Sequence, residues 1–310
     1  MTISSKILVK KINIAQDQVG QRIDNFLRKQ LPGVPNSLIY KIIRGGQVRV
    51  NSGRVKPLYR LKLDDIVRVP PVSIDKKPEK ISTQLIKDIK KSIIFENNDF
   101  IVLDKPAGIA VHSGSKINYD LISSLRTVKN YSNISLVHRL DKNTSGCLIL
   151  SKNYHTSSDL GKIFKDNQVA KEYIALLGGD LKSSNFEVND AISKEKINGL
   201  KSMVLSKDGK EAKSMFKINR QFHNSCLVNI VISTGRTHQI RVHSASIDHP
   251  VCGDVKYGDS KLNKDLKTFG LKRMFLHSHK ISFFYKKLYN FKSELSADLT
   301  DVLNNLEYNN

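Results

Sequence analysis

The chain carries, from residue 138 to residue 146, the sequence His-Arg-Leu-Asp-Lys-Asn-Thr-Ser-Gly. This charged segment lies between two apolar runs, Ile134 to Val137 and Cys147 to Leu150, so the pattern predicts a strand, a loop and a second strand. Such a loop would hold the carboxylate of Asp141 on a rigid platform, with Arg139 able to approach an anion. Asp, Asn, Thr, Ser and Gly are also ordinary turn residues, so the segment alone is compatible with a simple turn.

Two further segments combine strands with polar side chains. An apolar strand expected at Leu227 to Ile232 runs into Ser-Thr-Gly-Arg-Thr-His-Gln-Ile-Arg-Val-His at residues 233–243, which predicts a glycine turn and the start of a helix. A strand expected at Val169 to Leu177 carries Lys171 and Tyr173, and alternation puts both on one face. Spacing alone would make the tyrosine a core residue.

The three segments together resemble the motifs of the RluA-type pseudouridine synthases. They match that family's His-Arg-Leu-Asp-x-x-Thr-Ser-Gly loop, its Lys-x-Tyr element and its Thr-Gly-Arg-x-His-Gln-Ile/Leu-Arg-x-His run at every fixed position. The family isomerises uridine to pseudouridine within RNA and demands no metal, redox cofactor or nucleotide. The resemblance implies an α+β fold, with a mixed, mainly antiparallel β-sheet and flanking helices in the catalytic domain.

The resemblance also assigns roles to single residues. It implies that Asp141 is the indispensable catalytic residue, that Tyr173 packs on the target base, and that Arg236 pairs with Asp141 and keeps it ionised. It implies that Arg139 takes the place of the flipped base in the RNA, and that Ile240 lines the base pocket. Whether the aspartate acts as nucleophile or as base stays open. Further residues expected at the substrate are His138, Lys171 and Arg241.

Other parts of these motifs are expected to be structural or are ambiguous. Three weaker family matches, at residues 104–108, 253–258 and 276–278, are expected to support the fold. Arg241 and His243 would contact phosphate or buttress the glycine turn, and the sequence favours neither.

The N-terminal part of the chain predicts a separate unit. Ile23, Phe26, Leu27 and Leu31 recur at helical spacing, and a second helix is expected from Leu38 to Arg44, between the start signal Pro35-Asn36-Ser37 and a glycine cap at Gly45-Gly46. Short strands are expected at Val48 to Asn51 and Ile66 to Val69, with a Ser52-Gly53 turn.

This pattern resembles the S4-type RNA-binding domain, a small α/β module of two helices and short strands. Such domains present positive side chains to folded RNA. For any single one of these residues, a solvated surface charge is an equal alternative. The residues expected on or near the RNA face are Arg22, Lys41, Arg44, Arg49 and Arg54.

The length of 310 residues suits two domains. The predicted organisation is an N-terminal extension (residues 1–18), the S4-like domain (residues 19–70), a linker rich in Pro, Lys, Ser and Thr (residues 71–91) and the catalytic domain (residues 92–306). Within the last, a helix is expected from His155 to Asn167.

Composition narrows the class of partner. The chain has 51 Lys plus Arg and 29 Asp plus Glu, a net charge of +22, which favours a polyanion. No apolar run approaches the roughly 18 residues of a membrane span, and no signal-peptide core is present, so a cytoplasmic RNA-binding protein is expected rather than a membrane protein. The three cysteines form no Cys-x-x-Cys pair and are expected to be buried thiols. His238 and His243 are five residues apart, which does not suit a metal site on a helix.

The predicted function is therefore the isomerisation of uridines in 23S rRNA, the large-subunit ribosomal RNA, by a monomer. The alternative is a non-catalytic RNA-binding factor in ribosome assembly, which would explain the charge but not the three motifs. An RNA methyltransferase is disfavoured because no glycine-rich loop follows a strand and opens a helix.

Overall fold

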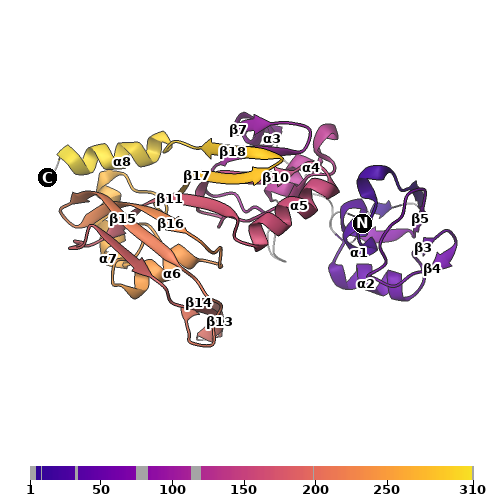
Figure 1. Ribbon diagram of the computed structural model, residues 1–310, viewed down its shortest axis with the longest axis horizontal. Helices are drawn as coiled ribbons and strands as arrows, with labels where there is room; N and C mark the ends of the chain where they lie inside the picture. Colours follow the sequence, from indigo (N-terminus) through magenta and orange to yellow (C-terminus); the bar gives the residue numbers. More distant parts are fainter. Residues whose placement is uncertain are drawn as a thin grey trace.

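The computed structural model of the chain describes residues 5–7, 9–31, 34–74, 83–112, 120–197 and 199–308. A small N-terminal unit lies at one end of an elongated molecule, and a long twisted sheet with its helices forms the rest (Figure 1). No helix within these ranges is long and apolar enough to cross a membrane.

Two helices and a small sheet form the N-terminal unit, as predicted. The second helix ends with Gly46 at φ +67°, where the amide of Gly46 donates to the carbonyl of Ile43 and the amide of Gln47 donates to that of Ile42. This pair of bonds needs a left-handed residue, which is why glycine ends the helix. The elements are α1 (Ile23–Gln30), α2 (Asn36–Arg44) and, in sheet order, β2 (Lys10–Asn13), β5 (Ile66–Val69), β3 (Arg49–Val50) and β4 (Gly53–Arg54).

The edges of this unit differ from the prediction in two places. The hairpin turn is centred on Asn51 and Ser52, with φ of +48° and +67°, one residue earlier than the expected Ser52-Gly53 turn, because a two-residue hairpin that matches strand twist needs two left-handed residues. In addition, β2 pairs with β5 and Ile14 is buried in the unit's core, so part of the expected N-terminal extension belongs to the unit.

The expected linker, residues 71–91, holds regular structure. A strand, β6 (Val72–Ile74), pairs with β1 (Ser5–Ile7), and a helix, α3, spans Thr83–Lys91. The prediction of an irregular segment is wrong for α3, because Leu85 and Ile89 lie one helical turn apart and pack into the main core. Residues 75–82 lie outside the described part of the chain.

One large sheet organises the remainder. Its order is β12-β15-β16-β11-β17-β10-β8-β7, with β18 beside β17 and β9 beside β10. Within the described residues the β10–β17 pair is parallel and the other pairs of this sheet are antiparallel, which confirms the predicted mixed, mainly antiparallel sheet. The strands are β7 (Ile93–Glu96), β8 (Phe100–Lys105), β9 (Ser135–Leu136), β10 (Ser145–Ser151), β11 (Val169–Gly178), β12 (Asn185–Val188), β15 (Ser214–Phe222), β16 (Ser225–Ile232), β17 (Leu276–Tyr285) and β18 (Lys287–Lys292).

Helices cover both faces of the sheet. On β8, Ile101 and Leu103 face a cluster formed with α3, α4 and α6, whereas Phe100 and Val102 face a cluster formed with α5 and aromatic residues of β18. A third cluster joins β11 to α7 and α8. The three cysteines are buried and free, as predicted. The helices are α4 (Leu121–Arg126), α5 (Tyr154–Lys165), close to its predicted range, α6 (Gln239–Ser246), α7 (Ser260–Leu266) and α8 (Ala297–Tyr308).

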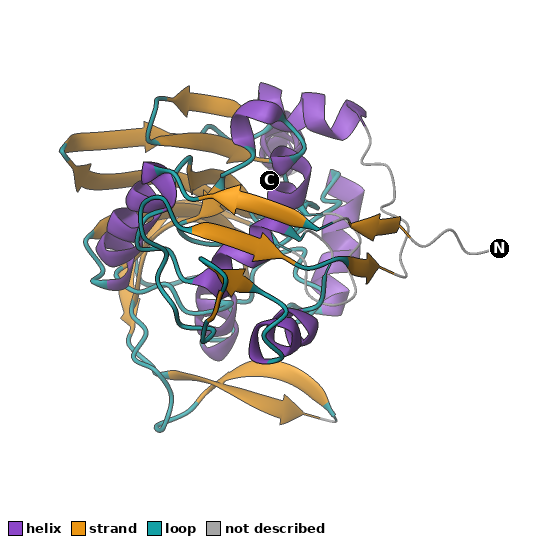
Figure 2. Ribbon diagram, turned by 90° about the vertical axis from the view of Figure 1, so that its right-hand side faces the viewer, coloured by secondary structure: helices purple, strands orange, loops and turns teal. Residues whose placement is uncertain are grey.

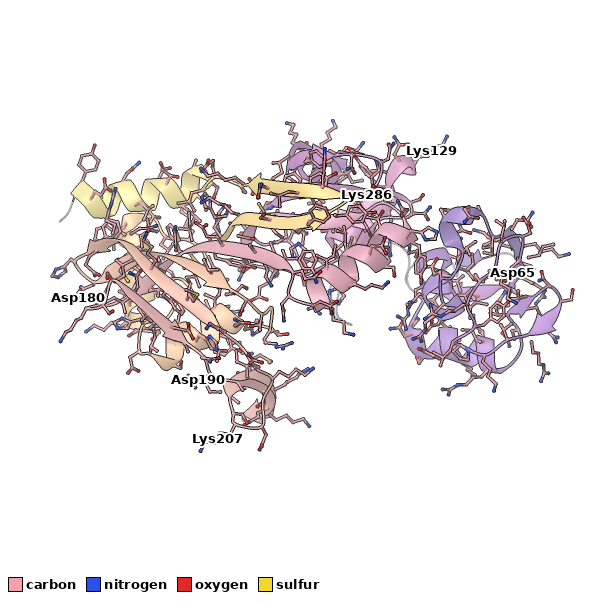
Figure 3. All side chains as sticks on the ribbon, viewed as in Figure 1. Asp65, Lys129, Asp180, Asp190, Lys207 and Lys286 are labelled. Atoms are coloured by element: carbon pink, nitrogen blue, oxygen red, sulfur yellow. The ribbon has the colours of Figure 1, made fainter. Side chains whose placement is uncertain are left out.

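A separate hairpin, β13 (Ile192–Ile197) and β14 (Leu200–Leu205), leaves the sheet between β12 and β15 and projects from the body of the domain (Figure 2). Lys207, which follows β14, points away from the body (Figure 3). The base of the hairpin is anchored, because Ile192 is buried with Ala212 and with Val242 of α6.

Polar contacts join the N-terminal unit to the sheet domain. The hydroxyl of Tyr154 donates to the carbonyl of Gly20 at 3.0 Å, and the ammonium of Lys29 donates to the carbonyl of Asn133 at 3.4 Å. Burial, helped by the charge of Arg126, lowers the pKa of Lys29 to about 8. The two parts therefore meet through hydrogen bonds at the N-terminal end of α5 and in the loop before β9.

Candidate active site

The charged loop at residues 138–144 connects two paired strands, β9 and β10. Two strands pair with the same edge of β10. The first residues of β10 pair with β17, and Leu150 near its end pairs with Leu136 of β9. Between these two ladders the amide of Ile149 donates to Nε2 of His138 at 2.9 Å. The imidazole thus takes the place of a strand carbonyl, and it fixes the start of the loop.

His138 therefore has a supporting position rather than the exposed position expected of an RNA contact, although it also lines the neighbouring cleft. Its ring stacks on Phe164 of α5 with centroids 4.5 Å apart. Burial, with a contribution from the charge of Lys171, lowers the pKa of His138 to about 3. The ring is neutral at physiological pH, as an acceptor of an amide proton must be.

Two further contacts hold the loop. Gly146 has φ +105°, and a Cβ there would overlap the carbonyl oxygen of Ser278 on β17, so only glycine fits. The ammonium of Lys105, fully buried at the end of β8, donates to the carbonyls of Pro106, Ile109 and Lys142 at 2.8 to 3.2 Å. Lys142 follows Asp141, so this buried lysine fixes the loop next to its acid.

Asp141 lies at a cleft and is partly accessible. Its carboxylate is 26% exposed and lines a cleft of about 590 Å³ together with Tyr173 and Ile232. A narrower extension of this cleft is lined by Ile240, the residue expected at the base pocket, and by Leu276. The side chain is thus neither sealed in the core nor free in solvent, and it can reach a group that enters the cleft.

The arginine bonded to Asp141 is Arg241, not Arg236. Nη1 of Arg241 donates to Oδ2 of Asp141 at 2.9 Å, whereas Nε of Arg236 donates to the backbone carbonyl of Glu211 at 2.8 Å. The expected Asp141–Arg236 pair is therefore wrong in this structure, although Arg236 lines the same cleft. The reason is the backbone of His238, which adopts φ +58° immediately before α6. With this start of the helix, Arg241 in the first turn of α6 faces the loop that carries Asp141.

A network around the glycine turn explains the position of Arg236. Oε1 of Gln239 accepts hydrogen bonds from the amide of Arg236 and the hydroxyl of Thr234. The ammonium of Lys171 donates to the carbonyl of Thr234 at 3.2 Å. Lys171 and Tyr173 share the buried face predicted from alternation, and burial together with the charge of Arg236 lowers the pKa of Lys171 to about 8. Lys171 thus stabilises the glycine turn by a hydrogen bond to the carbonyl of Thr234.

A second carboxylate, that of Asp254, was not recognised in the sequence. Nε and Nη2 of Arg241 donate to its two oxygens at 2.6 and 2.9 Å, and its side chain is 1% exposed. Burial acts to raise the pKa of Asp254, but the bonds from Arg241 outweigh it and hold the pKa below its usual value. Burial likewise acts to lower the pKa of Arg241, but its two carboxylate partners raise it. The guanidinium is therefore charged and fixed in orientation.

Arg241 and His243 were expected either to contact phosphate or to buttress the glycine turn, and both have hydrogen-bond partners within the protein. Arg241 bonds carboxylates as described. His243 is fully buried, with Nδ1 2.9 Å from the hydroxyl of Ser214 and Nε2 3.0 Å from the carbonyl of Asp190, so it buttresses α6. Among the described residues, no group of three or more His, Cys, Asp or Glu side chains is arranged to hold a metal ion.

Tyr173 supplies an aromatic surface next to Asp141. Its side chain is buried on β11 and lines both parts of the cleft. Burial raises the pKa of Tyr173 well above its usual value of 10.0, with the Ser278 hydroxyl acting in the opposite direction. The phenol is therefore neutral at physiological pH. Arg139, in contrast, is exposed at the mouth of the cleft.

In the N-terminal unit, the positive residues expected at RNA fall into two groups. Arg22 bonds the fully buried Asp24 through Nε and Nη2 at 3.1 and 2.7 Å, and Tyr40 donates to the same carboxylate. Arg49 donates to the carbonyl of Gly46, so both arginines are also structural. The remaining three are exposed: Lys41, Arg44 and Arg54.

Comparison with known proteins agrees with this fold and site. The family model described as RNA pseudouridylate synthase matches residues 99–246, and the S4 domain model matches residues 21–67, which confirms the class of each part. The chain is 42% identical over 284 residues to "Ribosomal large subunit pseudouridine synthase C" of Pasteurella multocida, covering 90% of this chain and 87% of that protein. It is 40% identical to the Haemophilus influenzae protein of the same name, covering 96% and 95%. The chain belongs to the RNA pseudouridylate synthase family.

Solved structures agree at the level of the fold. Human RNA Pseudouridylate Synthase Domain Containing 4 superposes with a TM-score of 0.61 at 24% identity, covering 72% of this chain and 96% of that chain. Human RNA Pseudouridylate Synthase Domain Containing 1 superposes with a TM-score of 0.57 at 26% identity, covering 66% and 83%.

Proposed function

We propose that this enzyme isomerises specific uridines of 23S rRNA to pseudouridine, with Asp141 as the catalytic residue. The observation that carries the proposal is the position of its carboxylate, which faces the cleft and is bonded to a guanidinium that a buried carboxylate holds in place. The relatives named as ribosomal large subunit pseudouridine synthases support large-subunit rRNA as the substrate.

The reaction breaks the bond between uracil and ribose, turns the base, joins its carbon five to the ribose and removes a proton from that carbon. Asp141 can act as nucleophile on the ribose or as the base that takes a ribose proton. Arg241 donates to Oδ2, and no described residue donates to Oδ1, so one oxygen is held while the other is available to the ribose. Arg241 also balances the carboxylate's charge as the base enters.

The walls of the cleft suit a flipped uracil. Ile232, Ile240 and Leu276 offer apolar contacts, and the ring of Tyr173 offers a surface on which a base can stack. Because its phenol is neutral, Tyr173 can exchange a proton through hydrogen bonds but is not a ready anionic base for the proton on carbon five. A water molecule or this phenol would complete that step.

RNA binding supplies the energy for base flipping, which costs a few kcal/mol. Arg139, exposed at the cleft mouth, is placed to fill the position that the base leaves. In the S4 domain, Lys41 and Arg44 are exposed on α2. Arg22 lies at the start of α1, and Arg49 lies on β3. With a net charge of +22, phosphate contacts of this kind give strong, salt-dependent binding.

We also propose the remaining features of the predicted organisation: a monomer in the cytoplasm, with an S4-like domain that ends near residue 70 and a catalytic domain that ends near residue 306. The pairing of β2 with β5 and the burial of Ile14 favour starting the S4-like domain near residue 10 rather than at residue 19. The burial of Ile89 in the main core favours starting the catalytic domain at residue 83 rather than 92.

The test uses the full chain and protein-free 23S rRNA, with pseudouridine mapped by carbodiimide modification or mass spectrometry. Wild type should convert a small number of uridines, and Asp141→Asn should bind the RNA without converting it. The matched control is Asp301→Asn, an exposed aspartate on α8, which should convert at the wild-type rate. Binding without conversion by wild type, or full conversion by Asp141→Asn, would contradict the proposal.

A further inference from the structure

We propose that Tyr257 is a positioning residue for Asp141: its hydroxyl fixes the tautomer of His238, whose ring faces the catalytic carboxylate, and ties that histidine to the β13–β14 hairpin. The inference rests on the proposed catalytic role of Asp141. It assigns a role to a motif, residues 253–258, that the sequence marks only as structural.

The hydroxyl of Tyr257 has two partners. The backbone amide of Met203, on β14, donates to the hydroxyl oxygen at 3.1 Å, and Nδ1 of His238 lies 2.9 Å from the same oxygen. An amide can only donate, so the single hydroxyl proton remains for the histidine. Tyr257 therefore donates to Nδ1, and the neutral imidazole carries its proton on Nε2.

The opposite tautomer is unfavourable for two reasons. With a proton on Nδ1, the Tyr257 oxygen would accept twice and its own proton would have no partner among these groups. The lone pair of Nε2 would then face Oδ2 of Asp141, which lies 3.7 Å away. With the proton on Nε2, the positive end of the N–H dipole points toward the carboxylate, beside the bond from Arg241. Arg241 thus donates a hydrogen bond to Oδ2 of Asp141, and the N–H dipole of His238 adds a weaker electrostatic interaction with the same oxygen at 3.7 Å.

The turn at residues 254–257 contacts both Arg241 and His238. Asp254 fixes the guanidinium of Arg241 and accepts the backbone amides of Lys256 and Tyr257. The Tyr257 ring lies 4.9 Å from the Arg241 guanidinium and meets the His238 ring edge-on, with centroids 5.5 Å apart. A ring in this position attracts the cation and blocks rotation of the imidazole.

The hairpin end of the link carries exposed positive side chains. Met203 and Tyr257 pack against the cluster that anchors the hairpin to α6. Among the side chains that the structure describes in the hairpin and its flanks, four lysines are exposed, and one of them, Lys207, points away from the body in Figure 3. Phosphate bound by these lysines would seat the hairpin, and the Met203 amide would then hold the Tyr257 hydroxyl in place. The exposed lysines are Lys194, Lys196, Lys207 and Lys210.

The tautomer can be measured directly. In histidine labelled with ¹⁵N, the two ring nitrogens give distinct shifts when protonated and unprotonated, and His238→Gln identifies the signal among the nine histidines. Wild type should show the proton on Nε2 of His238. Tyr257→Phe, which keeps the ring and removes only the hydroxyl, should shift the population toward the Nδ1-protonated form. Finding wild-type His238 protonated on Nδ1 would overturn the inference without any activity measurement.

Kinetics provide the second readout. Loss of one hydrogen bond from the site predicts that Tyr257→Phe lowers the single-turnover rate roughly three- to tenfold, with rRNA affinity unchanged. Tyr257→Leu, which also removes the ring from Arg241, should lower it further. The matched control is Tyr131→Phe, because the Tyr131 hydroxyl donates to Glu96 at 2.8 Å and neither residue lines the cleft. This variant should change neither the rate nor the His238 signal.

The outcomes separate this inference from the proposed function. If wild type converts rRNA and Tyr257→Phe retains both the rate and the His238 tautomer, Tyr257 is not a positioning residue and Asp141 is unaffected as a candidate. If wild type fails to convert any rRNA, the proposed function fails, while the tautomer measurement still reports on the link.

Discussion

The two arginines near the catalytic loop make different predictions. Arg241 is 11% exposed, bonds Asp141 once and Asp254 twice, and Asp254 is 1% exposed. Arg241→Met would leave a buried carboxylate unpaired, which costs about 3 to 5 kcal/mol of stability. It would also remove a charge-assisted bond to Asp141 worth about 1.5 to 3 kcal/mol, so kcat should fall roughly 10- to 100-fold.

Two further variants separate stability from catalysis. In Arg241→Met/Asp254→Asn no unpaired charge is left at residue 254, and an amide oxygen still accepts backbone amides, so much of the stability should return while kcat stays low. Arg236→Met removes a bond to a backbone carbonyl only, and should raise KM while changing kcat less than about threefold. Urea unfolding and single-turnover pseudouridine formation measure the two quantities. A larger loss of kcat in folded Arg236→Met than in folded Arg241→Met would refute this assignment.

Three other predictions concern stability. Gly146→Ala should lower Tm strongly because its Cβ would overlap the Ser278 carbonyl, and an unchanged Tm would contradict the close approach described here. Burial acts to raise the pKa of Asp24, but hydrogen bonds, first of all from Arg22, hold this pKa below its usual value of 3.8. The ionised Asp24 therefore stabilises the fold above pH 3.8, and this stabilisation is lost as the pH falls through the pKa of the folded state. Between pH 7 and 3 the Tm of wild type should fall more than that of Asp24→Asn, and equal falls would count against the buried pair. Burial lowers the pKa of Lys105 from 10.5 to about 7, so between these pH values the unfolded chain binds one more proton than the folded chain. The free energy of unfolding of wild type should therefore rise relative to that of Lys105→Met from about pH 7 to 9.5. Urea midpoints that show the opposite trend would disprove this.

Local patterns were sufficient for much of the fold. The helices α1 and α5 were predicted because their apolar residues repeat at helical spacing, and α2 was predicted from its start signal and its glycine cap. The shared face of Lys171 and Tyr173 was predicted because side chains alternate along a strand. The helix α3 was missed because Pro, Lys, Ser and Thr around it outweighed the short repeat of Leu85 and Ile89.

Long-range geometry accounts for the errors at the site. Arg236 and Arg241 lie in one motif, and spacing does not tell which faces Asp141, because the direction of α6 depends on a left-handed backbone at His238. Asp254 carries no local signal either, since its partner is 13 residues away. Such contacts depend on how distant strands and turns meet, and a single sequence does not record that.

The connection between β9 and β10 limits how this enzyme can vary in length. Both strands are bonded to each other at Leu136 and Leu150, and every residue of β10 is buried. One residue added within β10 before Leu150 would turn its inward side chains to the opposite face and move Gly146 away from its close approach to β17. The β13–β14 hairpin projects from the body of the domain (Figure 2), so we expect insertions and deletions among natural variants to gather in this hairpin and to be rare next to the catalytic acid.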